Sequence, residues 1–159
     1  MSMFIRQRWI DPRLKHTKVD GKKFIELDTT VMDAVWIPDL YILNEKKASH
    51  HDVTVPNKLM HIYPDGLVVY SVRVTGTFSC SMLLHKYPLD TQKCSFVMES
   101  YGYSVDTLLL RWNKVPVERS PILSLPQFEL GEIKSYTCDK EYAGGIYIFC
   151  VLYRISLYS

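Results

Sequence analysis

The chain has 159 residues, of which 47% are hydrophobic and 23% are charged. These proportions exclude a disordered chain, and the length is enough for one substantial hydrophobic core. The net charge of +2 comes from scattered basic residues without a block of like charge, so we expect no nucleic-acid partner.

Alternation with a period of two dominates the chain, and no long helical stripe interrupts it. In residues 4–9 the even-numbered side chains share one face of a predicted strand and the odd-numbered side chains share the other. Further strands are predicted at 59–63, 67–80, 95–103, 107–112, 128–136 and 146–157, and breaks at 37–38 and 114–126. Short strands and frequent turns without intervening helices predict an all-β fold, a β-sandwich, formed as one domain over residues 1–159.

The four cysteines are Cys80, Cys94, Cys138 and Cys150. Their spacing fits neither a C-x-x-C site nor a zinc knuckle, and it favours disulfides in an oxidising compartment. Four cysteines allow three pairings. We favour adjacent pairing, Cys80 with Cys94 and Cys138 with Cys150, because each pair then closes one hairpin.

Catalytic and metal-binding motifs are missing from the sequence. In a strand, the adjacent His50 and His51 point to opposite faces and cannot easily share one ion, so we interpret His50-His51-Asp52 as a solvated loop. No nucleophile motif accompanies the serine, histidine and aspartate residues. We therefore expect no enzyme activity, no metal and no cofactor.

A polar surface is predicted on two of the strands. Alternation places Phe4 and Arg6 on one face of the first strand, and Val69, Ser71 and Arg73 on one face of the strand at 67–80. An arginine near a hydroxyl suits a carboxylate, because the planar guanidinium forms charge-assisted, bidentate hydrogen bonds. The alternative interpretation of each strand arginine is a solvated surface residue.

A second surface is rich in aromatic residues. Glu99, Tyr101 and Tyr103 alternate along one predicted strand, and Tyr41 follows the Trp36-Ile37-Pro38-Asp39 turn. The segment between Cys138 and Cys150 adds Tyr142, Tyr147 and Phe149. Converging rings hold an ammonium group through their π faces, and a carboxylate adds charge complementarity. The alternative is packing in the sandwich core.

Several motifs of the chain occur together in one known family. The thirteen residues between Cys80 and Cys94 include Tyr87-Pro88-Leu89-Asp90, an aromatic-Pro-x-Asp sequence, and resemble the defining loop of the Cys-loop receptors, the pentameric ligand-gated ion channels. Trp36-Ile37-Pro38-Asp39 resembles their W-x-P-D turn. Four more segments continue the similarity in the same order over nearly the whole chain: Phe4 to Leu14, Asn44-Glu45-Lys46, Tyr63-Pro64-Asp65-Gly66 and Glu99-Ser100-Tyr101-Gly102-Tyr103.

The resemblance implies the immunoglobulin-like β-sandwich of the extracellular domain, truncated at both ends, without its N-terminal helix, first strand and transmembrane region. A spaced pair such as Cys138 and Cys150 is similar to that of glycine receptors and of invertebrate glutamate- and histamine-gated chloride channels. Acetylcholine receptor principal subunits carry adjacent cysteines there, and GABA-A receptors lack the pair. The resemblance therefore implies a chloride-channel subunit in the plasma membrane, facing outward and located postsynaptically.

The resemblance also implies roles for the two surfaces. The residues that would receive the ligand carboxylate are Arg6 and Ser71, with Phe4, Val69 and Arg73 beside them. Those of the opposite, principal face are Tyr101 for the ammonium group, Glu99 as the nearby acid and Tyr41, capped by the hairpin with Tyr142, Tyr147 and Phe149. Because Ile148 stands at the expected capping position, either Tyr147 or Phe149 caps the ligand if the hairpin shifts by one residue.

The ligand implied is a small neurotransmitter such as glycine, glutamate or histamine, bound between subunits of a homo- or heteropentamer. The signal would reach the membrane domain through Tyr87, Pro88, Leu89 and Asp90, in a loop that we expect to be exposed and little restrained. Two alternatives remain open: a soluble secreted binding protein of the same fold, and a structural subunit with a non-functional pocket.

Overall fold

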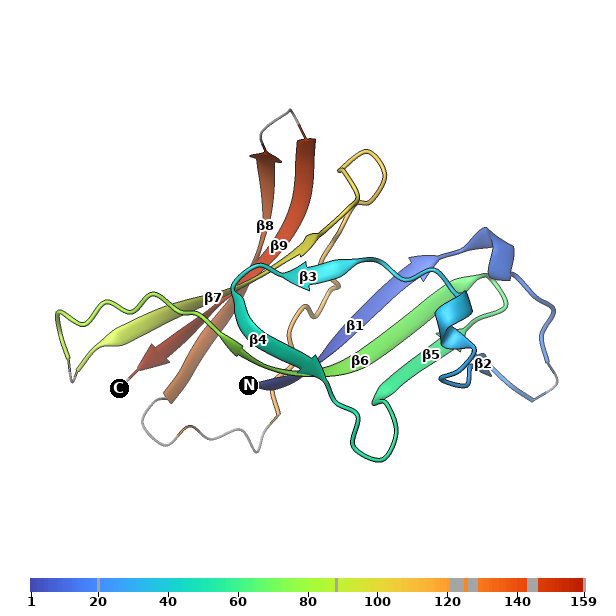
Figure 1. Ribbon diagram of the computed structural model, residues 1–159, viewed down its shortest axis with the longest axis horizontal. Coiled ribbons are helices and arrows are strands. Elements are labelled where there is room, and N and C mark those ends of the chain that lie inside the picture. Colours follow the sequence, from blue (N-terminus) through green and yellow to red (C-terminus); the bar gives the residue numbers. More distant parts are fainter. Residues whose placement is uncertain (20, 88, 121–124, 126–128, 143–145, 159) are drawn as a thin grey trace. The chain divides into compact units, whose positions relative to one another are not determined.

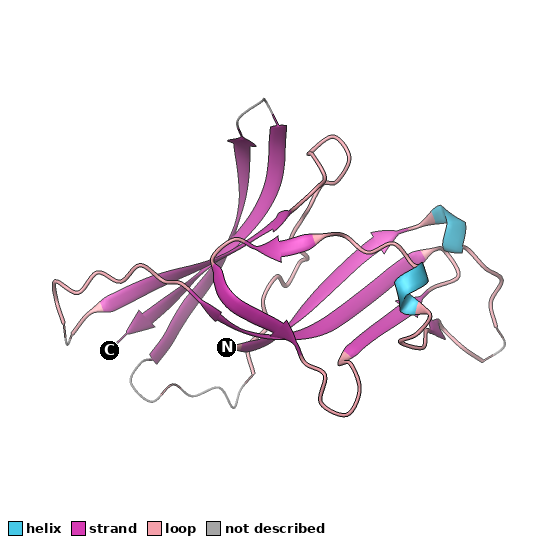
Figure 2. Cartoon of the chain, in the orientation of Figure 1, coloured by secondary structure: helices cyan, strands magenta, loops and turns pink. Residues whose placement is uncertain are grey.

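The computed structural model describes residues 1–19, 21–87, 89–120, 125, 129–142 and 146–158, and from residue 139 onward it describes the backbone alone. This part of the chain contains nine β-strands and two single-turn 3-10 helices, Pro12–Leu14 and Met32–Ala34 (Figures 1 and 2). The strands form two sheets, the components from which a β-sandwich is built. The predicted all-β fold class is confirmed. Within the described residues, no helix is long and apolar enough to span a bilayer.

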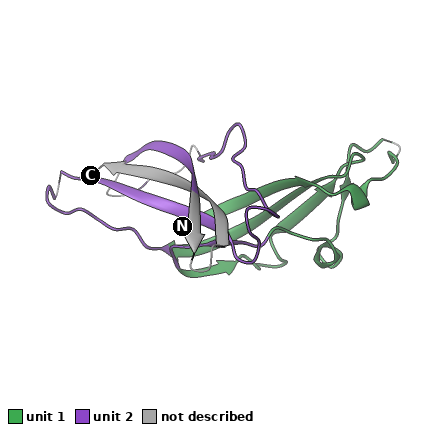
Figure 3. Cartoon of the chain, turned by 90° about the horizontal axis from the view of Figure 1, so that it is seen from above, with its two compact units in different colours: residues 1–38, 46–77 green, residues 39–45, 78–159 purple. Residues whose placement is uncertain are grey.

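The first of two compact units comprises residues 1–38 and 46–77 (Figure 3). Its sheet has five strands. The path through it runs β1 (Ser2–Ile10), β6 (Leu67–Phe78), β5 (Lys58–Ile62) and β2 (Ile25–Glu26), and β4 (Glu45–His50) also pairs with β6. Strands β1, β5 and β6 confirm the predictions at 4–9, 59–63 and 67–80.

Two strands of this sheet were not predicted, for different reasons. The β2 strand has two residues, which is too short for any alternation to be visible. The β4 strand is mostly exposed and contains Lys46 and Lys47 in place of an apolar face. The prediction of a loop is wrong for His50, the last residue of β4, whereas His51 and Asp52 lie beyond the strand.

The core of the first unit lies on the inward face of β6 and its neighbours. Trp9, on the odd-numbered face of β1, packs edge to face against Trp36 with a centroid distance of 5.9 Å. The buried cluster consists of Met32, Met60, Val68, Tyr70, Val72 and Val74. Met32 of this cluster lies in the second 3-10 helix, and the other members lie at alternating positions of β5 and β6. The remaining positions of those two strands therefore form the outward face that carries the polar surface.

The turn between β5 and β6 depends on Gly66. The Gly66 N–H donates to the Tyr63 carbonyl and the Tyr63 N–H donates to the Leu67 carbonyl, each at 2.9 Å. Gly66 has a φ of +86°, and a Cβ built on it would lie 2.6 Å from the Asp11 carbonyl oxygen. Glycine is therefore required both by the backbone conformation and by the close approach of the chain after β1.

The second unit comprises residues 39–45 and 78–159 (Figure 3). Its antiparallel four-stranded sheet has the order β3 (Leu40–Ile42), β7 (Thr91–Ser100), β9 (Ile146–Tyr158) and β8 (Glu129–Tyr142). Strands β8 and β9 confirm the predictions at 128–136 and 146–157, although β8 continues further than expected. Phe96 and Met98 of β7 are buried, and the Phe96 ring packs against Phe78 with a centroid distance of 5.0 Å.

The strand predicted at 107–112 is wrong. The N–H groups of Thr107 and Leu108 both donate to the Ser104 carbonyl, so the chain forms a turn there instead of presenting its backbone to a neighbouring strand. Trp112 uses its indole N–H to contact the sheet, donating to the Tyr136 carbonyl of β8 at 2.9 Å. Trp112 therefore contacts the sheet through its side chain and not through strand pairing.

Candidate functional site

The predicted polar surface lies on the outward face of β1 and β6. The antiparallel register places Arg6 opposite Ser71, Phe4 opposite Arg73 and Arg8 opposite Val69. Directly opposed residues lie on the same face of a sheet, with their Cβ atoms about 4.5–5.5 Å apart. Arg6 and Phe4 are exposed, and Ser71 is only 7% exposed between its neighbours. A residue with a guanidinium group and a residue with a hydroxyl group are thus direct neighbours across two strands, and both groups bind carboxylates well.

The two arginines of this surface differ in their partners. Arg73 has its guanidinium carbon 6.0 Å from the centroid of the Phe4 ring, and its Nε donates to the Ser2 hydroxyl at 3.2 Å. Arg73 is therefore directed toward the start of β1. Arg6 lies directly across from Ser71, farther along the sheet.

The predicted aromatic surface has its centre where β3 meets β7. Tyr41 lies opposite Glu99 in the antiparallel pair, and its hydroxyl donates to Glu99 Oε2 at 3.0 Å. Glu99 is completely buried, whereas Tyr101 is 81% exposed. The rings of Tyr41 and Tyr101 meet edge to face, with a centroid distance of 6.0 Å and an interplanar angle of 84°. The exposed Tyr101 ring is thus held beside a buried carboxylate by Tyr41, which contacts both.

The strand predicted at 95–103 ends earlier, at Ser100, because the Asp39 carboxylate accepts hydrogen bonds from the chain there. One carboxylate oxygen accepts from the Ser100 hydroxyl and the other from the Gly102 N–H, both at 2.6 Å. The Ser100 hydroxyl oxygen also accepts from the Tyr103 N–H at 3.0 Å. The predicted alternation of Glu99, Tyr101 and Tyr103 on one strand face is therefore wrong, and Tyr101 is presented by a turn that Asp39 fixes.

The hairpin of β8 and β9 contains the second cysteine pair. Cys138 lies directly opposite Cys150 in the strand pairing, and Cys138 is disulfide-bonded. The backbones of Tyr142, Tyr147 and Phe149 lie in these strands near the hairpin end, with Tyr142 at the last position of β8. The side chains of these three residues and of Cys150 lie outside the described residues, so the choice between Tyr147 and Phe149 as the cap stays a prediction.

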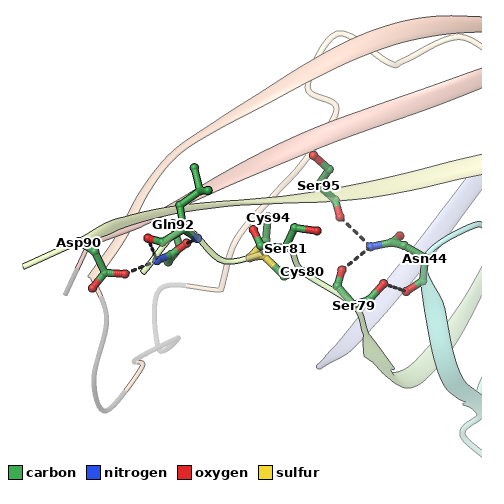
Figure 4. Close-up of a disulfide and its surroundings, with 9 residues drawn as sticks. Asn44, Ser79, Cys80, Ser81, Asp90, Gln92, Cys94 and Ser95 are labelled. Atoms are coloured by element: carbon green, nitrogen blue, oxygen red, sulfur yellow. Dashed lines mark hydrogen bonds between the residues drawn. A yellow bond between two sulfur atoms is a disulfide. The ribbon is translucent and has the colours of Figure 1, made fainter. Parts of the chain in front are cut away.

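The first cysteine pair forms the predicted disulfide. Cys80 and Cys94 are bonded, with 5.1 Å between their Cα atoms (Figure 4). Tyr87 and Leu89 of the enclosed loop are highly exposed, whereas Asp90 is buried, and Pro88 lies outside the described residues. The expectation of an exposed loop is confirmed for Tyr87 and Leu89. The expectation of little restraint is wrong at Leu83, which is hydrogen-bonded through its backbone to the side chain of Gln92.

Two amide side chains of this region were given no role by the sequence. Asn44 donates from Nδ2 to the carbonyls of Ser79 and Ser95, at 2.9 and 2.8 Å. Gln92 is 1% exposed, on the same face of β7 as the buried Phe96. The sequence could have indicated a role for Gln92, because it is a polar residue on a strand face that is otherwise expected to be apolar. A buried amide needs fixed hydrogen-bond partners, so a contact with nearby polar groups was to be expected.

Comparisons with known proteins indicate the family of the chain. A family model described as the neurotransmitter-gated ion-channel ligand binding domain matches residues 1–146. The gamma-aminobutyric acid receptor subunit beta-4 of Gallus gallus is 39% identical over 150 residues, which cover 93% of this chain. The chain spans 30% of the length of that relative.

Proposed function

Because the chain belongs to the family of neurotransmitter-gated ion-channel ligand-binding domains, we propose that it is the extracellular agonist-binding domain of a subunit of a pentameric chloride channel in the plasma membrane. The agonist is a small amino acid, and gamma-aminobutyric acid (GABA) is the first candidate. The observation that carries this proposal is the 39% identity to a GABA receptor subunit over nearly the whole chain. Glycine, glutamate and histamine stay as comparison ligands, because the spaced pair of Cys138 and Cys150 resembles that of their receptors, whereas GABA-A receptors lack it.

The chemistry of the two surfaces supports an amino-acid agonist. A zwitterion needs a cationic partner for its carboxylate and a π-rich or anionic partner for its ammonium group. Arg6 with Ser71 offers the first on β1 and β6, and Tyr101 beside Tyr41 and Glu99 offers the second. One chain carries both chemistries, so identical neighbouring subunits would supply a complete site at each interface of a homopentamer. Channel opening then requires only that the agonist binds the open state more tightly.

The proposal is tested by expressing the full-length subunit alone in oocytes and applying GABA, glycine, glutamate and histamine in turn. We expect GABA to evoke a saturable current that reverses at the chloride equilibrium potential. A current that follows the sodium gradient would overturn the chloride assignment. A subunit that reaches the cell surface but responds to none of the four ligands would indicate a structural role, and a secreted product without current would indicate a soluble binding protein.

A further inference from the structure

The side chain of Gln92, near the start of β7, holds the Cys80–Cys94 loop in place through hydrogen bonds. Its Nε2 donates to the Leu83 carbonyl and its Oε1 accepts from the Leu83 N–H, each at 3.0 Å. The same Nε2 group also donates to the Asp90 carboxylate. One carboxamide thus satisfies both backbone groups of Leu83, as a neighbouring strand would, and joins the two halves of the loop.

The disulfide does not provide this restraint. It holds Cys80 against Cys94, and on its other side Asn44 bridges Ser79 and Ser95. Leu83 lies three residues beyond Cys80 and belongs to no strand. Within the described residues, the backbone N–H and carbonyl of Leu83 are both hydrogen-bonded to Gln92, so Gln92 fixes the position of the loop after the disulfide.

The position of Gln92 on β7 connects the loop with the aromatic surface. The strand runs from Gln92 to Glu99, the partner of Tyr41, and pairs with β9 in a continuous register over this length. Seven residue steps at 3.3 Å correspond to a length of about 23 Å. At the loop, the Leu83 side chain is 71% exposed and Leu84 is also exposed. Strand β7 therefore connects Glu99, the buried acid of the aromatic surface, with the exposed apolar residues Leu83 and Leu84.

We propose that Gln92 is the positioning residue that makes the loop move with β7, so that a displacement of this strand at Glu99 is carried to Leu83 and Leu84. The proposal rests on the proposed function, since it assigns Gln92 to the step between agonist binding and channel opening. Gln92 is not among the residues proposed to contact the agonist. The disulfide, the Asn44 contacts and the Tyr41–Glu99 bond do not involve Gln92, so we expect its replacement to leave them in place.

Two variants remove the contact in different ways. Gln92→Leu keeps a similar volume and loses all three hydrogen bonds. Gln92→Glu keeps the shape, but a carboxylate cannot donate to the Leu83 carbonyl and it faces the Asp90 carboxylate. Lys93→Gln is the matched control, because Lys93 is exposed on the next position of β7 and its replacement changes the net charge by the same amount as Gln92→Glu.

The first measurement is hydrogen exchange at the Leu83 amide in the purified full-length subunit. We expect exchange to be at least tenfold faster in Gln92→Leu and in Gln92→Glu, and within twofold of the unchanged protein in Lys93→Gln. Unchanged exchange at Leu83 in both Gln92 variants would overturn the proposal. This measurement needs no agonist, so it tests whether Gln92 restrains the loop even where GABA evokes no current and the proposed function fails.

The second measurement separates coupling from binding. With GABA as the probe, we expect the maximal current per surface subunit to fall at least fivefold in Gln92→Glu, while displacement of labelled GABA shifts less than twofold. A merely structural role would lower binding and current together, and that result would also overturn the proposal. Lys93→Gln is expected to leave both quantities unchanged.

Discussion

The Tyr41 hydroxyl donates a hydrogen bond to the completely buried carboxylate of Glu99 across the β3–β7 pair, at 3.0 Å. A buried carboxylate is tolerated only where donors replace the water that it has lost. Tyr41 also contacts the exposed Tyr101 ring. The same residue therefore stabilises the buried acid and orients the aromatic side chain proposed to contact the agonist.

Tyr41→Phe should lower the melting temperature of the purified full-length subunit. The variant removes one hydrogen bond to the buried Glu99 carboxylate while keeping the ring, and the loss of such a bond costs about 0.5–1.5 kcal/mol. Tyr101→Phe is the control, because this side chain is largely exposed and its hydroxyl should contribute less than about 0.5 kcal/mol. Equal melting temperatures for Tyr41→Phe and the unchanged protein would show that the hydrogen bond does not stabilise the fold.

Arg6→Ala should raise the GABA concentration needed for half-maximal activation at least tenfold, since hydrogen bonds to charged groups contribute about 1.5–3 kcal/mol. Arg8→Ala is the matched control. Arg8 is exposed on the same face of β1, but its partner across the strands is Val69 and not a hydroxyl residue. Equal sensitivity of the Arg6 and Arg8 variants would remove Arg6 from the proposed carboxylate receptor.

The polar surface could be predicted from the sequence because it depends on alternation alone. The faces of β1 and β6 follow from a period of two, so Arg6 and Ser71 were assigned to outward faces before their register was known. The register itself pairs residues about 65 positions apart, and no local signal specifies it. Alternation therefore did not predict that Arg6 lies directly across from Ser71, and only the family resemblance placed the two residues together.

The hydrogen bonds of polar side chains to irregular backbone could not be predicted. Asp39 ends β7 at Ser100, and Gln92 binds the backbone of Leu83, in segments without a repeating pattern. Each contact depends on where a loop places one peptide group, which sequence periodicity does not encode. Strand β4 was missed for a related reason, since an edge strand with two lysines shows no apolar face.

Gly66→Ala should be strongly destabilising, and Gly21→Ala separates the two causes. Both glycines have positive φ, +86° and +74°, but a Cβ at Gly66 would meet the Asp11 carbonyl oxygen at 2.6 Å whereas nothing lies within 4 Å of one at Gly21. We expect Gly21→Ala to cost about 1 kcal/mol from backbone strain, and Gly66→Ala to cost clearly more because the backbone must shift. Melting temperatures of the two variants provide the comparison. Equal decreases in melting temperature would mean that the close approach to Asp11 adds nothing to the destabilisation.

In the variant Asp11→Asn, the stability of the fold should depend less on pH in the acidic range than it does in the unchanged protein. The Arg13 side chain donates from Nε and Nη2 to the two oxygens of the Asp11 carboxylate, at 2.9 and 2.7 Å. These hydrogen bonds are the main cause that holds the pKa of Asp11 below its ordinary value of 3.8, and the Arg13 N–H and charge act in the same direction. Burial of the carboxyl opposes the shift.

The sign of the effect follows from the lowered pKa. A carboxyl whose pKa is lower in the folded state stabilises the fold at pH values above its unfolded pKa, and this contribution is lost as the pH falls through the folded pKa. The unchanged protein should therefore be more stable than Asp11→Asn at neutral pH, and the difference should shrink as the pH falls below about 4. Melting temperatures measured from neutral pH to about pH 3 test this, since an asparagine does not titrate in that range. A difference that stays constant over the whole range would show that ionisation of Asp11 is not linked to folding.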